Sequence, residues 1–307
     1  MEGIGAIHIF LYIVLNYLGY SLVIIFQLLF ISTFPGIYHL LQLFLSNICI
    51  YLLFKIRLAN NYVNPNSSTS KGNIESSNTD NTKIIGENDP IIQFNLMPNI
   101  GCDFCKITKL PLRSHHCEIC NKCVKCFDHH CWILAGCIGE NNKLFFIIFL
   151  FLQNCSIDCS LIAIMILLKE QKNEDIKYFL TFYFSLICLF SVIFLFTFIY
   201  HFYLFITNQT NYELFNEEQC PYILVYSFEK NKYLQQRGVD IGNNIRYKPF
   251  DMGFKNNFFL YFNLLNNNKD NKNGINWENI YYENLKNTRH KTDCCDKINK
   301  IVKNINN

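Results

Sequence analysis

The sequence predicts an α-helical integral membrane protein with four transmembrane helices and a small cytosolic zinc-binding domain between helices two and three. Two observations carry this prediction. Of the 307 residues, 50% are hydrophobic and 17% are charged, and the hydrophobic residues gather in long runs. Eight of the 15 Cys and four of the eight His lie between Cys102 and Cys137. The net charge of +3 is too small and too dispersed for a nucleic-acid-binding face, so no nucleic-acid partner is expected.

Residues 1–58 supply the first two predicted membrane helices. No Asp, Glu, Lys or Arg occurs between Gly3 and Phe54, and one membrane pass needs about 20 apolar residues. The break at Pro35-Gly36 places these helices at about 5–31 and 37–57. A cleaved signal peptide is the alternative for the first helix, but the run is far longer than a signal-peptide core and no basic residue precedes it.

Residues 144–207 supply the other two helices, at 144–168 and 178–207. Both segments are rich in Phe, Ile and Leu, and Asp158 is the only charged residue in the first of them. Because an ionisable side chain is costly at membrane depth, we expect Asp158 either to bond a neighbouring helix or to line a substrate cavity.

The distribution of Lys and Arg predicts the orientation. Four passes leave both termini and the segment between helices two and three on one side, which carries 10 Lys and Arg in residues 55–143 and 14 after residue 207. Residues 169–177, on the other side, carry 3. The basic side is therefore predicted to be cytosolic, and Asn66, which matches a glycosylation acceptor, is predicted to stay unmodified.

The cytosolic segments differ in character. Residues 59–100 are Asn-rich and polar, as expected for a flexible linker. Residues 208–262 form a cytosolic C-terminal region, and residues 263–307 are predicted to be a mostly disordered tail. Within this tail, Cys294-Cys295 is either a lipidation or metal site or a pair of ordinary thiols.

Segment 101–146 is predicted to bind zinc. Its C-x2-C pairs let two thiolates from one tight turn reach the same ion. A disulfide framework is the alternative, but it fits poorly with interleaved His and a reducing cytosolic side. Two closed tetrahedral sites use eight of the twelve Cys and His ligands, which leaves four for other roles.

The run Asp128-His129-His130-Cys131 suggests one such role. A thiolate is a nucleophile, and a neighbouring His or a zinc ion lowers the pKa of a thiol. A His whose second nitrogen faces a carboxylate is held in the tautomer that acts as a base. Acyl transfer by a cysteine nucleophile beside the bilayer is therefore a candidate chemistry.

The cassette resembles the Asp-His-His-Cys (DHHC) domain of the protein S-acyltransferases, or palmitoyltransferases. The matching residues are Cys102, Cys105, Pro111, Arg113, His116, Cys117, Cys120, Cys123, Asp128, His129, His130, Cys131, Cys137, Asn142 and Phe146. Two weaker family motifs follow the fourth helix. Thr210-Asn211-Tyr212-Glu213 resembles Thr-Thr-x-Glu, and Phe250–Phe258 resembles an aromatic–Gly–Asn motif in which Asn257 is the characteristic Asn.

The resemblance implies a role for each cassette residue. Cys131 is the acylated nucleophile, His129 its base and Asp128 the orienting carboxylate. One structural zinc ion takes Cys102, Cys105, His116 and Cys123, and the other takes Cys117, Cys120, His130 and Cys137. Cys126 and His115 are left over; Cys126 is expected to be incidental, and His115 to pack or hydrogen-bond locally.

Three positions depart from the family pattern. One extra residue, assigned to Leu110, lies between Cys105 and Cys117. Trp132 stands where the family has Pro, and Gly136 where Asn is common. Because Pro restricts the residue before it, its absence is expected to loosen the orientation of Cys131 and to slow the reaction.

The resemblance implies a protein S-palmitoyltransferase that moves a fatty acyl group from acyl-CoA, through acyl-Cys131, to cysteine thiols of membrane-associated proteins. Its expected partners are acyl-CoA, those substrates and the lipid bilayer, and its expected location is the Golgi or the ER. The alternatives are a weakly active or inactive membrane-anchored zinc scaffold and a RING-like interaction protein. The RING interpretation lacks a further C-x2-C pair, because the pattern ends at the lone Cys137.

Overall fold

The computed structural model describes residues 36–64, 101–216 and most of 219–266, with parts of 275–284 and a few positions between 7 and 14. Several predicted features lie wholly or mostly outside the described residues: the helix at 5–31, the linker 59–100 with Asn66, and the tail 263–307 with Cys294-Cys295.

The chain divides into two compact units. The helical unit comprises Met1–Asn61 and His130–Phe205, and the cysteine-rich unit comprises Tyr62–His129 and Ile206–Asn307.

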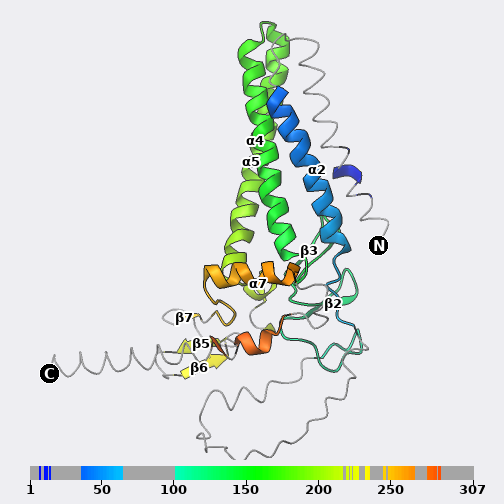
Figure 1. Ribbon diagram of the computed structural model, residues 1–307, viewed down its shortest axis with the longest axis vertical. Coiled ribbons are helices and arrows are strands. Elements are labelled where there is room, and N and C mark those ends of the chain that lie inside the picture. Colours follow the sequence, from blue (N-terminus) through cyan, green and yellow to red (C-terminus); the bar gives the residue numbers. More distant parts are fainter. Residues whose placement is uncertain are drawn as a thin grey trace, which may run out of the picture. The chain divides into compact units, whose positions relative to one another are not determined.

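Among the residues that the structure describes, three helices of the helical unit are long and apolar enough to cross a membrane (Figure 1). They are α2 (Gly36–Leu58), α4 (Lys143–Glu170) and α5 (Glu174–Ile206), and they correspond to three of the four predicted spans. The start of α5 is four residues earlier than predicted. The cause is Asn173, whose Oδ1 accepts the N–H of Ile176 at 3.3 Å, followed by two acidic residues that suit a helix N-terminus.

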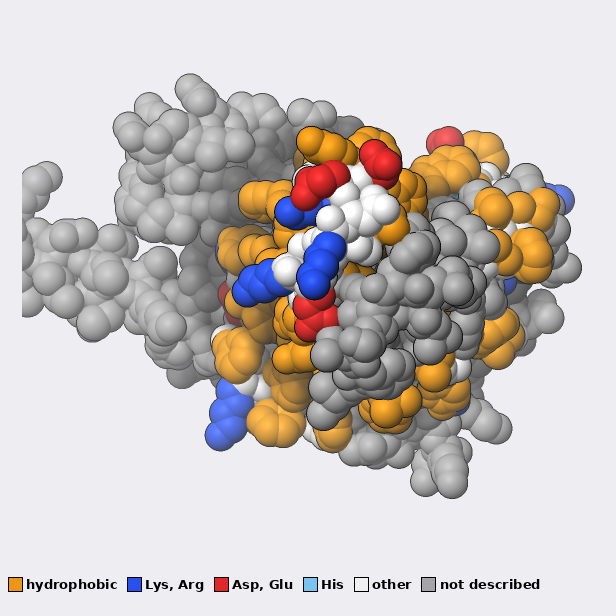
Figure 2. Space-filling view, turned by 90° about the horizontal axis from the view of Figure 1, so that it is seen from above, with side chains coloured by type: hydrophobic (Ala, Val, Ile, Leu, Met, Phe, Trp, Pro, Cys, Tyr) orange, Lys and Arg blue, Asp and Glu red, His pale blue; other side chains and the backbone are white. Residues whose placement is uncertain are grey.

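The turn between α4 and α5 marks one end of the apolar region. Figure 2 looks onto this end and shows charged side chains gathered over the turn, with hydrophobic side chains around them. The charged residues here are Lys169, Glu170, Lys172, Glu174, Asp175 and Lys177. Beneath them, Leu167 of α4 and Leu180 of α5 pack together and close the turn.

Polar residues in the middle of α4 bond to the neighbouring helices. The Ser156 hydroxyl lies 3.3 Å from that of Ser46 on α2, and the Asn154 amide donates to the Phe194 carbonyl of α5 at 3.4 Å. Asp158 itself is exposed on α4. The interhelical bonding that we considered for Asp158 is thus made by its uncharged neighbours.

The cysteine-rich unit is built on short strands and turns. Strands β1 (His115–Cys117) and β2 (Lys122–Val124) form an antiparallel hairpin in which His116 lies opposite Cys123. Val63 joins the hairpin by donating its N–H to the Cys123 carbonyl at 2.9 Å. Strands β5 (Leu224–Ser227), β6 (Lys232–Gln235) and β7 (Ile245–Arg246) form a second sheet in the order β6-β5-β7. Two helices, α6 (Asn211–Phe215) and α7 (Phe254–Asn266), flank that sheet in the sequence.

A further pair of strands precedes α4. They are β3 (His129–Cys131) and β4 (Gly136–Ile138). Asn142, immediately before α4, fastens this segment to α2, because its amide donates to the carbonyls of Ile56 and Cys137, each at 3.0 Å, and its Oδ1 accepts the Gly139 N–H at 2.8 Å. This buried position needs a side chain that both donates and accepts hydrogen bonds, which explains the Asn in the sequence.

Candidate metal and catalytic site

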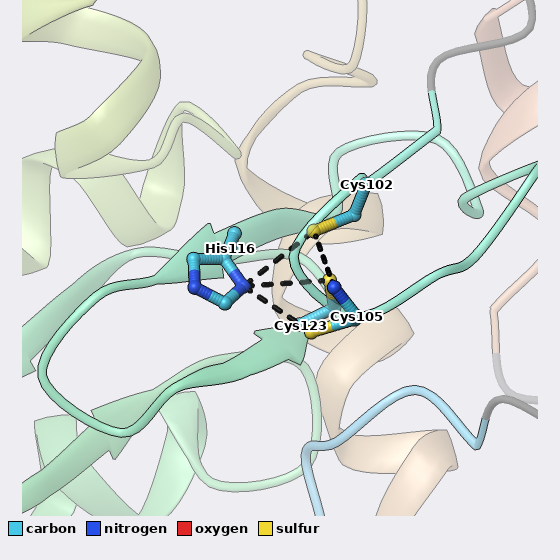
Figure 3. A group of neighbouring side chains, drawn as sticks. All are labelled: Cys102, Cys105, His116 and Cys123. Atoms are coloured by element: carbon cyan, nitrogen blue, oxygen red, sulfur yellow. Dashed lines mark hydrogen bonds between the residues drawn. The ribbon is translucent and has the colours of Figure 1, made fainter.

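The first predicted ligand set converges on one point in the cysteine-rich unit (Figure 3). The Nδ1 atom of His116 lies 3.3 Å from the Cys105 sulfur, 3.6 Å from that of Cys102 and 3.9 Å from that of Cys123. Ligand atoms around a tetrahedral zinc ion lie about 3.5–3.8 Å apart, as bond lengths near 2.0–2.3 Å require. These four side chains fit a closed zinc site.

Both C-x2-C pairs form the same kind of turn. The N–H of Cys105 donates to the Cys102 sulfur at 3.4 Å, and the N–H of Cys120 donates to the Cys117 sulfur at 3.5 Å. The residue after each pair, Lys106 or Asn121, has a positive φ of 54° or 50°. A peptide N–H directed at a sulfur stabilises the thiolate, which is the form that binds metal.

The second predicted set, Cys117, Cys120, His130 and Cys137, has the same kinds of donor. The His130 Nδ1 atom lies 3.7 Å from the Cys137 sulfur. Each set has three thiols and one imidazole, a donor composition suited to structural zinc, so the two sets together can bind two zinc ions.

Metal analysis tests this stoichiometry. Purified wild-type protein is expected to release two zinc ions per chain to a strong chelator, and Cys102→Ser to release about one, because a closed site rarely survives the loss of a ligand. Cys188→Ser, which alters a thiol of α5 outside both sets, is the matched control and should still release two. Equal zinc content in the Cys102 and Cys188 variants would contradict the ligand assignment.

Asp128 and His129 form a close pair. The Asp128 Oδ2 atom lies 2.7 Å from His129 Nδ1, and Asp128 is buried. Its other oxygen, Oδ1, accepts the N–H of Asn211 at 3.1 Å, and its carbonyl accepts the N–H of Tyr212 at 3.0 Å. A carboxylate held this way keeps the proton of neutral His129 on Nδ1, so Nε2 is the nitrogen that can act as a base.

The side chains of strand β3 alternate between its two faces. His129 and Cys131 occupy alternate positions of this strand, and alternate positions project to the same face. His130, the predicted zinc ligand, projects to the other face. The order His-His-Cys in one short strand thus places His130 on one side and His129 with Cys131 on the other, and Cys131 remains partly exposed.

The Thr210–Glu213 segment holds Asp128 in place through backbone N–H groups. It forms a capping box at the start of α6, in which Thr210 Oγ1 accepts the N–H of Glu213 at 3.1 Å and Glu213 Oε2 accepts the N–H of Thr210 at 2.9 Å. Asn211, at the position of the second Thr of the family motif, contributes through its backbone N–H to Asp128. The replacement by Asn therefore keeps this contact, because a backbone group makes it.

Arg113 joins Glu213 in a fully buried ion pair. Its Nε donates to Glu213 Oε1 at 2.7 Å and its Nη2 to Oε2 at 2.8 Å, which is a bidentate pair. Asn208 accepts two further bonds, through Oδ1 at 3.1 Å and through its carbonyl at 2.9 Å. The guanidinium also packs against two aromatic rings, 4.0 Å from the centre of Phe250 and 4.4 Å from that of Trp277. The role of Trp277 has no signal in the sequence, because this contact spans 164 positions.

Asn257 stabilises the second C-terminal motif through hydrogen bonds of its side chain. It is fully buried, accepts the N–H of Met252 at 3.0 Å, and donates to the Ile206 carbonyl at 2.7 Å and to Asp251 Oδ1 at 2.8 Å. Gly253 adopts a φ of +85°, a conformation that strains any residue with a Cβ atom. The motif thus combines a turn that requires Gly with an Asn that ties the turn to the end of α5.

His115, left over from the ligand sets, packs locally as expected. Its ring centre lies 4.0 Å from that of Tyr212, and its Nε2 lies 3.3 Å from the Tyr222 hydroxyl. Burial lowers the pKa of His115 to about 4, so the ring is neutral at physiological pH. Burial also raises the pKa of the Tyr222 hydroxyl, which keeps its proton.

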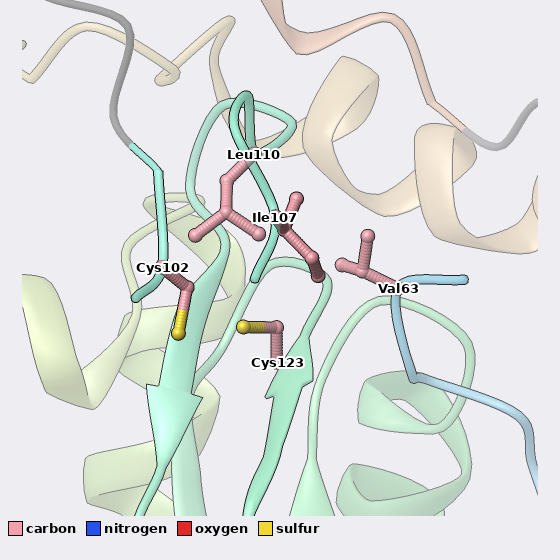
Figure 4. Packing of buried hydrophobic residues seen from close by; sticks show 5 residues of the cluster. All are labelled: Val63, Cys102, Ile107, Leu110 and Cys123. Atoms are coloured by element: carbon pink, nitrogen blue, oxygen red, sulfur yellow. The ribbon is translucent and has the colours of Figure 1, made fainter. Parts of the chain in front are cut away.

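The three departures have different consequences. Leu110 is buried against Val63, Ile107, Cys102 and Cys123, so the extra residue adds to the small core beneath the first ligand set (Figure 4). Trp132 is 65% exposed and meets the His130 ring edge-on at 5.4 Å. Gly136 has room for a Cβ atom, because the nearest neighbouring atom lies at 3.8 Å.

These features define a class of protein: membrane proteins with a Cys/His zinc domain and a candidate thiol nucleophile. The features are helices able to span a membrane, ligand sets suited to structural zinc, and an Asp–His pair close in sequence to a partly exposed Cys. Comparison with known proteins makes the class specific. Residues 97–218 match the family described as DHHC palmitoyltransferase, so the chain carries a DHHC palmitoyltransferase domain, as the motifs predict.

Curated relatives resemble parts of the chain. The chain is 32% identical over 169 residues to "Probable protein S-acyltransferase 6" of Arabidopsis thaliana, which covers 51% of this chain and 38% of that protein. It is 35% identical over 120 residues to "Palmitoyltransferase ZDHHC15" of Xenopus laevis, covering 38% and 35%. It is 53% identical over 53 residues to "Palmitoyltransferase SWF1" of Saccharomyces cerevisiae, covering 17% and 16%. The matched part thus spans less than two fifths of each of these relatives.

Proposed function

We propose that the protein is a protein S-palmitoyltransferase that transfers a fatty acyl group from acyl-CoA to cysteine thiols of membrane-associated proteins. The observation that carries the proposal is the Asp128–His129 pair, whose His129 lies two positions before the partly exposed Cys131 on strand β3. The match of residues 97–218 to the DHHC palmitoyltransferase family and the names of the relatives support it.

The proposed reaction has two steps. His129 Nε2 removes the proton of Cys131, and the thiolate attacks the thioester carbonyl of acyl-CoA, which releases the CoA thiol and forms acyl-Cys131. His129 then takes the proton of a substrate thiol, and the substrate thiolate attacks acyl-Cys131. The acyl group moves to the substrate, and His129 returns the proton to the departing Cys131 thiolate. Each step exchanges one thioester for another, and catalysis depends mainly on positioning.

Other groups of the chain have supporting roles in this proposal. Asp128 holds the tautomer of His129 and stabilises the imidazolium that forms. Zinc bound by the two ligand sets has a structural role, because closed sites offer no open coordination position. The exposed Lys106, Lys109 and Lys122 are candidates to bind the phosphates of CoA.

The proposal also includes the topology. We place the DHHC domain and both termini in the cytosol, with four membrane passes, in the Golgi or ER. The proposed division is 1–58 and 144–207 for the membrane helices, 59–100 for the linker, 101–146 for the zinc domain, and 208–262 and 263–307 for the C-terminal region and tail. The excess of Lys and Arg in the cytosolic segments supports this orientation.

Direct acyl labelling tests the function. Purified protein incubated with an alkynyl fatty acyl-CoA should become labelled, and neutral hydroxylamine should remove the label, because it cleaves thioesters. A cysteine-containing membrane protein added afterwards should accept the label. Wild-type protein that retains two zinc ions yet acquires no label would instead support a zinc scaffold.

The role of Asp128 can be tested separately. Asp128→Asn keeps an oxygen that can accept the Asn211 N–H but disfavours the reactive tautomer of His129, so the rate of auto-acylation is expected to fall about 10²–10⁴-fold. Single-turnover labelling across a pH series measures the effect. Glu118→Gln removes an exposed acid of the same domain and should leave the rate unchanged. Equal rates in both variants would exclude Asp128 from the mechanism.

A further inference from the structure

Helix α7 carries a stripe of exposed aromatic side chains. Phe254, Phe258, Phe259 and Phe262 are all exposed, by 36–59%. Phe254, Phe258 and Phe262 follow one another at intervals of four, and their rings stack at 6.5 and 6.3 Å. Four exposed Phe on one side of a 13-residue helix exceed what a water-facing surface normally carries.

A neighbouring side of α7 is hydrogen-bonded to the end of a membrane-spanning helix. Asn257 donates to the carbonyl of Ile206, which is the last residue of α5, at 2.7 Å. One turn further along α7, the Tyr261 hydroxyl donates to Asn208 Oδ1 at 3.1 Å. One contact falls on the last residue of the apolar span and the other on a residue two positions beyond it, where the chain leaves the hydrocarbon region.

The charges of α7 also suit a membrane surface. The helix contains no Asp or Glu, and its single charged residue is the exposed Lys255. At 100° per residue, Lys255 falls among the four Phe, whereas the exposed Asn256 and Asn263 fall outside the stripe. A Lys in such a stripe can bury its alkyl chain with the rings and extend its ammonium group to lipid phosphates.

We infer that the exposed aromatic side of α7 binds the phospholipid bilayer, with the Phe rings at the boundary between headgroups and acyl chains and Lys255 on the phosphates. An interfacial helix of this kind buries an apolar face at that depth and gains affinity from anionic lipids. Because Asn257, in the first turn of α7, bonds to the last residue of α5, the lipid that α7 reaches belongs to the membrane that α5 crosses. The inference does not depend on the proposed enzymatic activity.

Tryptophan quenching in lipid nanodiscs tests this inference on the full-length protein. Phe258→Trp places a fluorophore in the stripe, and Asn256→Trp places one on the same helix outside it; the spectrum of wild-type protein is subtracted to remove Trp132 and Trp277. Phospholipids that carry a quencher at the headgroup or the upper acyl chain should quench the Phe258→Trp variant at least twofold more than the Asn256→Trp variant. Acrylamide in the water should show the reverse order.

Two results would overturn the inference. Equal access of acrylamide to both variants would show a stripe exposed to water. An indole in the Phe258→Trp variant that is shielded from acrylamide and from lipid quenchers alike would show that protein covers the stripe. A second measurement tests Lys255: Lys255→Gln in the Phe258→Trp background should remove any extra lipid quenching gained when phosphatidylserine replaces phosphatidylcholine, and an unchanged gain would exclude the phosphate contact.

Discussion

Cys131→Ser is expected to abolish hydroxylamine-sensitive labelling by acyl-CoA, with a loss of at least about 10³-fold in the rate of auto-acylation. A Ser hydroxyl is far less ionised than a thiol near neutral pH, and any ester that formed would resist neutral hydroxylamine. The measurement is in-gel detection of an alkynyl acyl group before and after hydroxylamine. This is the largest effect on activity that the site predicts.

The same variant carries its own control for folding. Cys131 belongs to neither ligand set, so Cys131→Ser is expected to retain two zinc ions and the thermal stability of the wild type. Labelling that persists at the wild-type level in Cys131→Ser would place the nucleophile elsewhere in the chain. Loss of zinc together with labelling would show that Cys131 has a structural role instead.

Glu213→Gln is expected to lower the free energy of unfolding by about 3–5 kcal/mol, because it leaves Arg113 charged and buried without its counterion. The pair is bidentate and inaccessible to water, with side-chain exposures of 0% and 5%. The loss of the carboxylate also weakens the capping box that begins α6. Thermal unfolding of the purified protein, detected through the release of zinc, measures the change in the free energy of unfolding.

A second ion pair provides the matched control. Lys177 and Glu174 lie 3.7 Å apart at the start of α5 with exposures of 46% and 68%, so Glu174→Gln should change stability by no more than about 1 kcal/mol. Similar effects of the two substitutions would show that Arg113 and Glu213 are not energetically coupled. A stable Glu213→Gln variant with slowed labelling would instead show that the pair positions Asp128 through α6.

Much of this architecture could be predicted from local patterns. Uninterrupted apolar runs predict α2, α4 and α5 because a span is defined by length and by the cost of charge in hydrocarbon. C-x2-C pairs predict a thiolate turn because both sulfurs come from one short segment, as Cys102 and Cys105 show. The Asp128–His129 pair is likewise local, between adjacent residues. In each case the determining interaction spans only a few positions.

Other features depend on residues far apart in the sequence. Arg113 was visible as a family residue, but its partners Glu213, Phe250 and Trp277 lie 100–164 positions away, and no local pattern pairs them. The exposure of Asp158 could not be foreseen either, because it depends on which side of α4 its neighbours cover. Periodicity shows that a residue is polar within a helix; only packing shows where that residue points.

The apolar runs and the spacing of Cys and His were sufficient to predict membrane helices and zinc ligand sets, because hydrophobic length and metal coordination act over short stretches of chain. The resemblance of the same residues to a known family implied the DHHC domain. The folded chain supplied the buried Arg113–Glu213 pair, the backbone support of Asp128 by α6 and the exposed Phe stripe of α7. These features arise when distant segments exclude water from some polar groups and leave some apolar groups exposed, and a linear pattern does not record which groups those are.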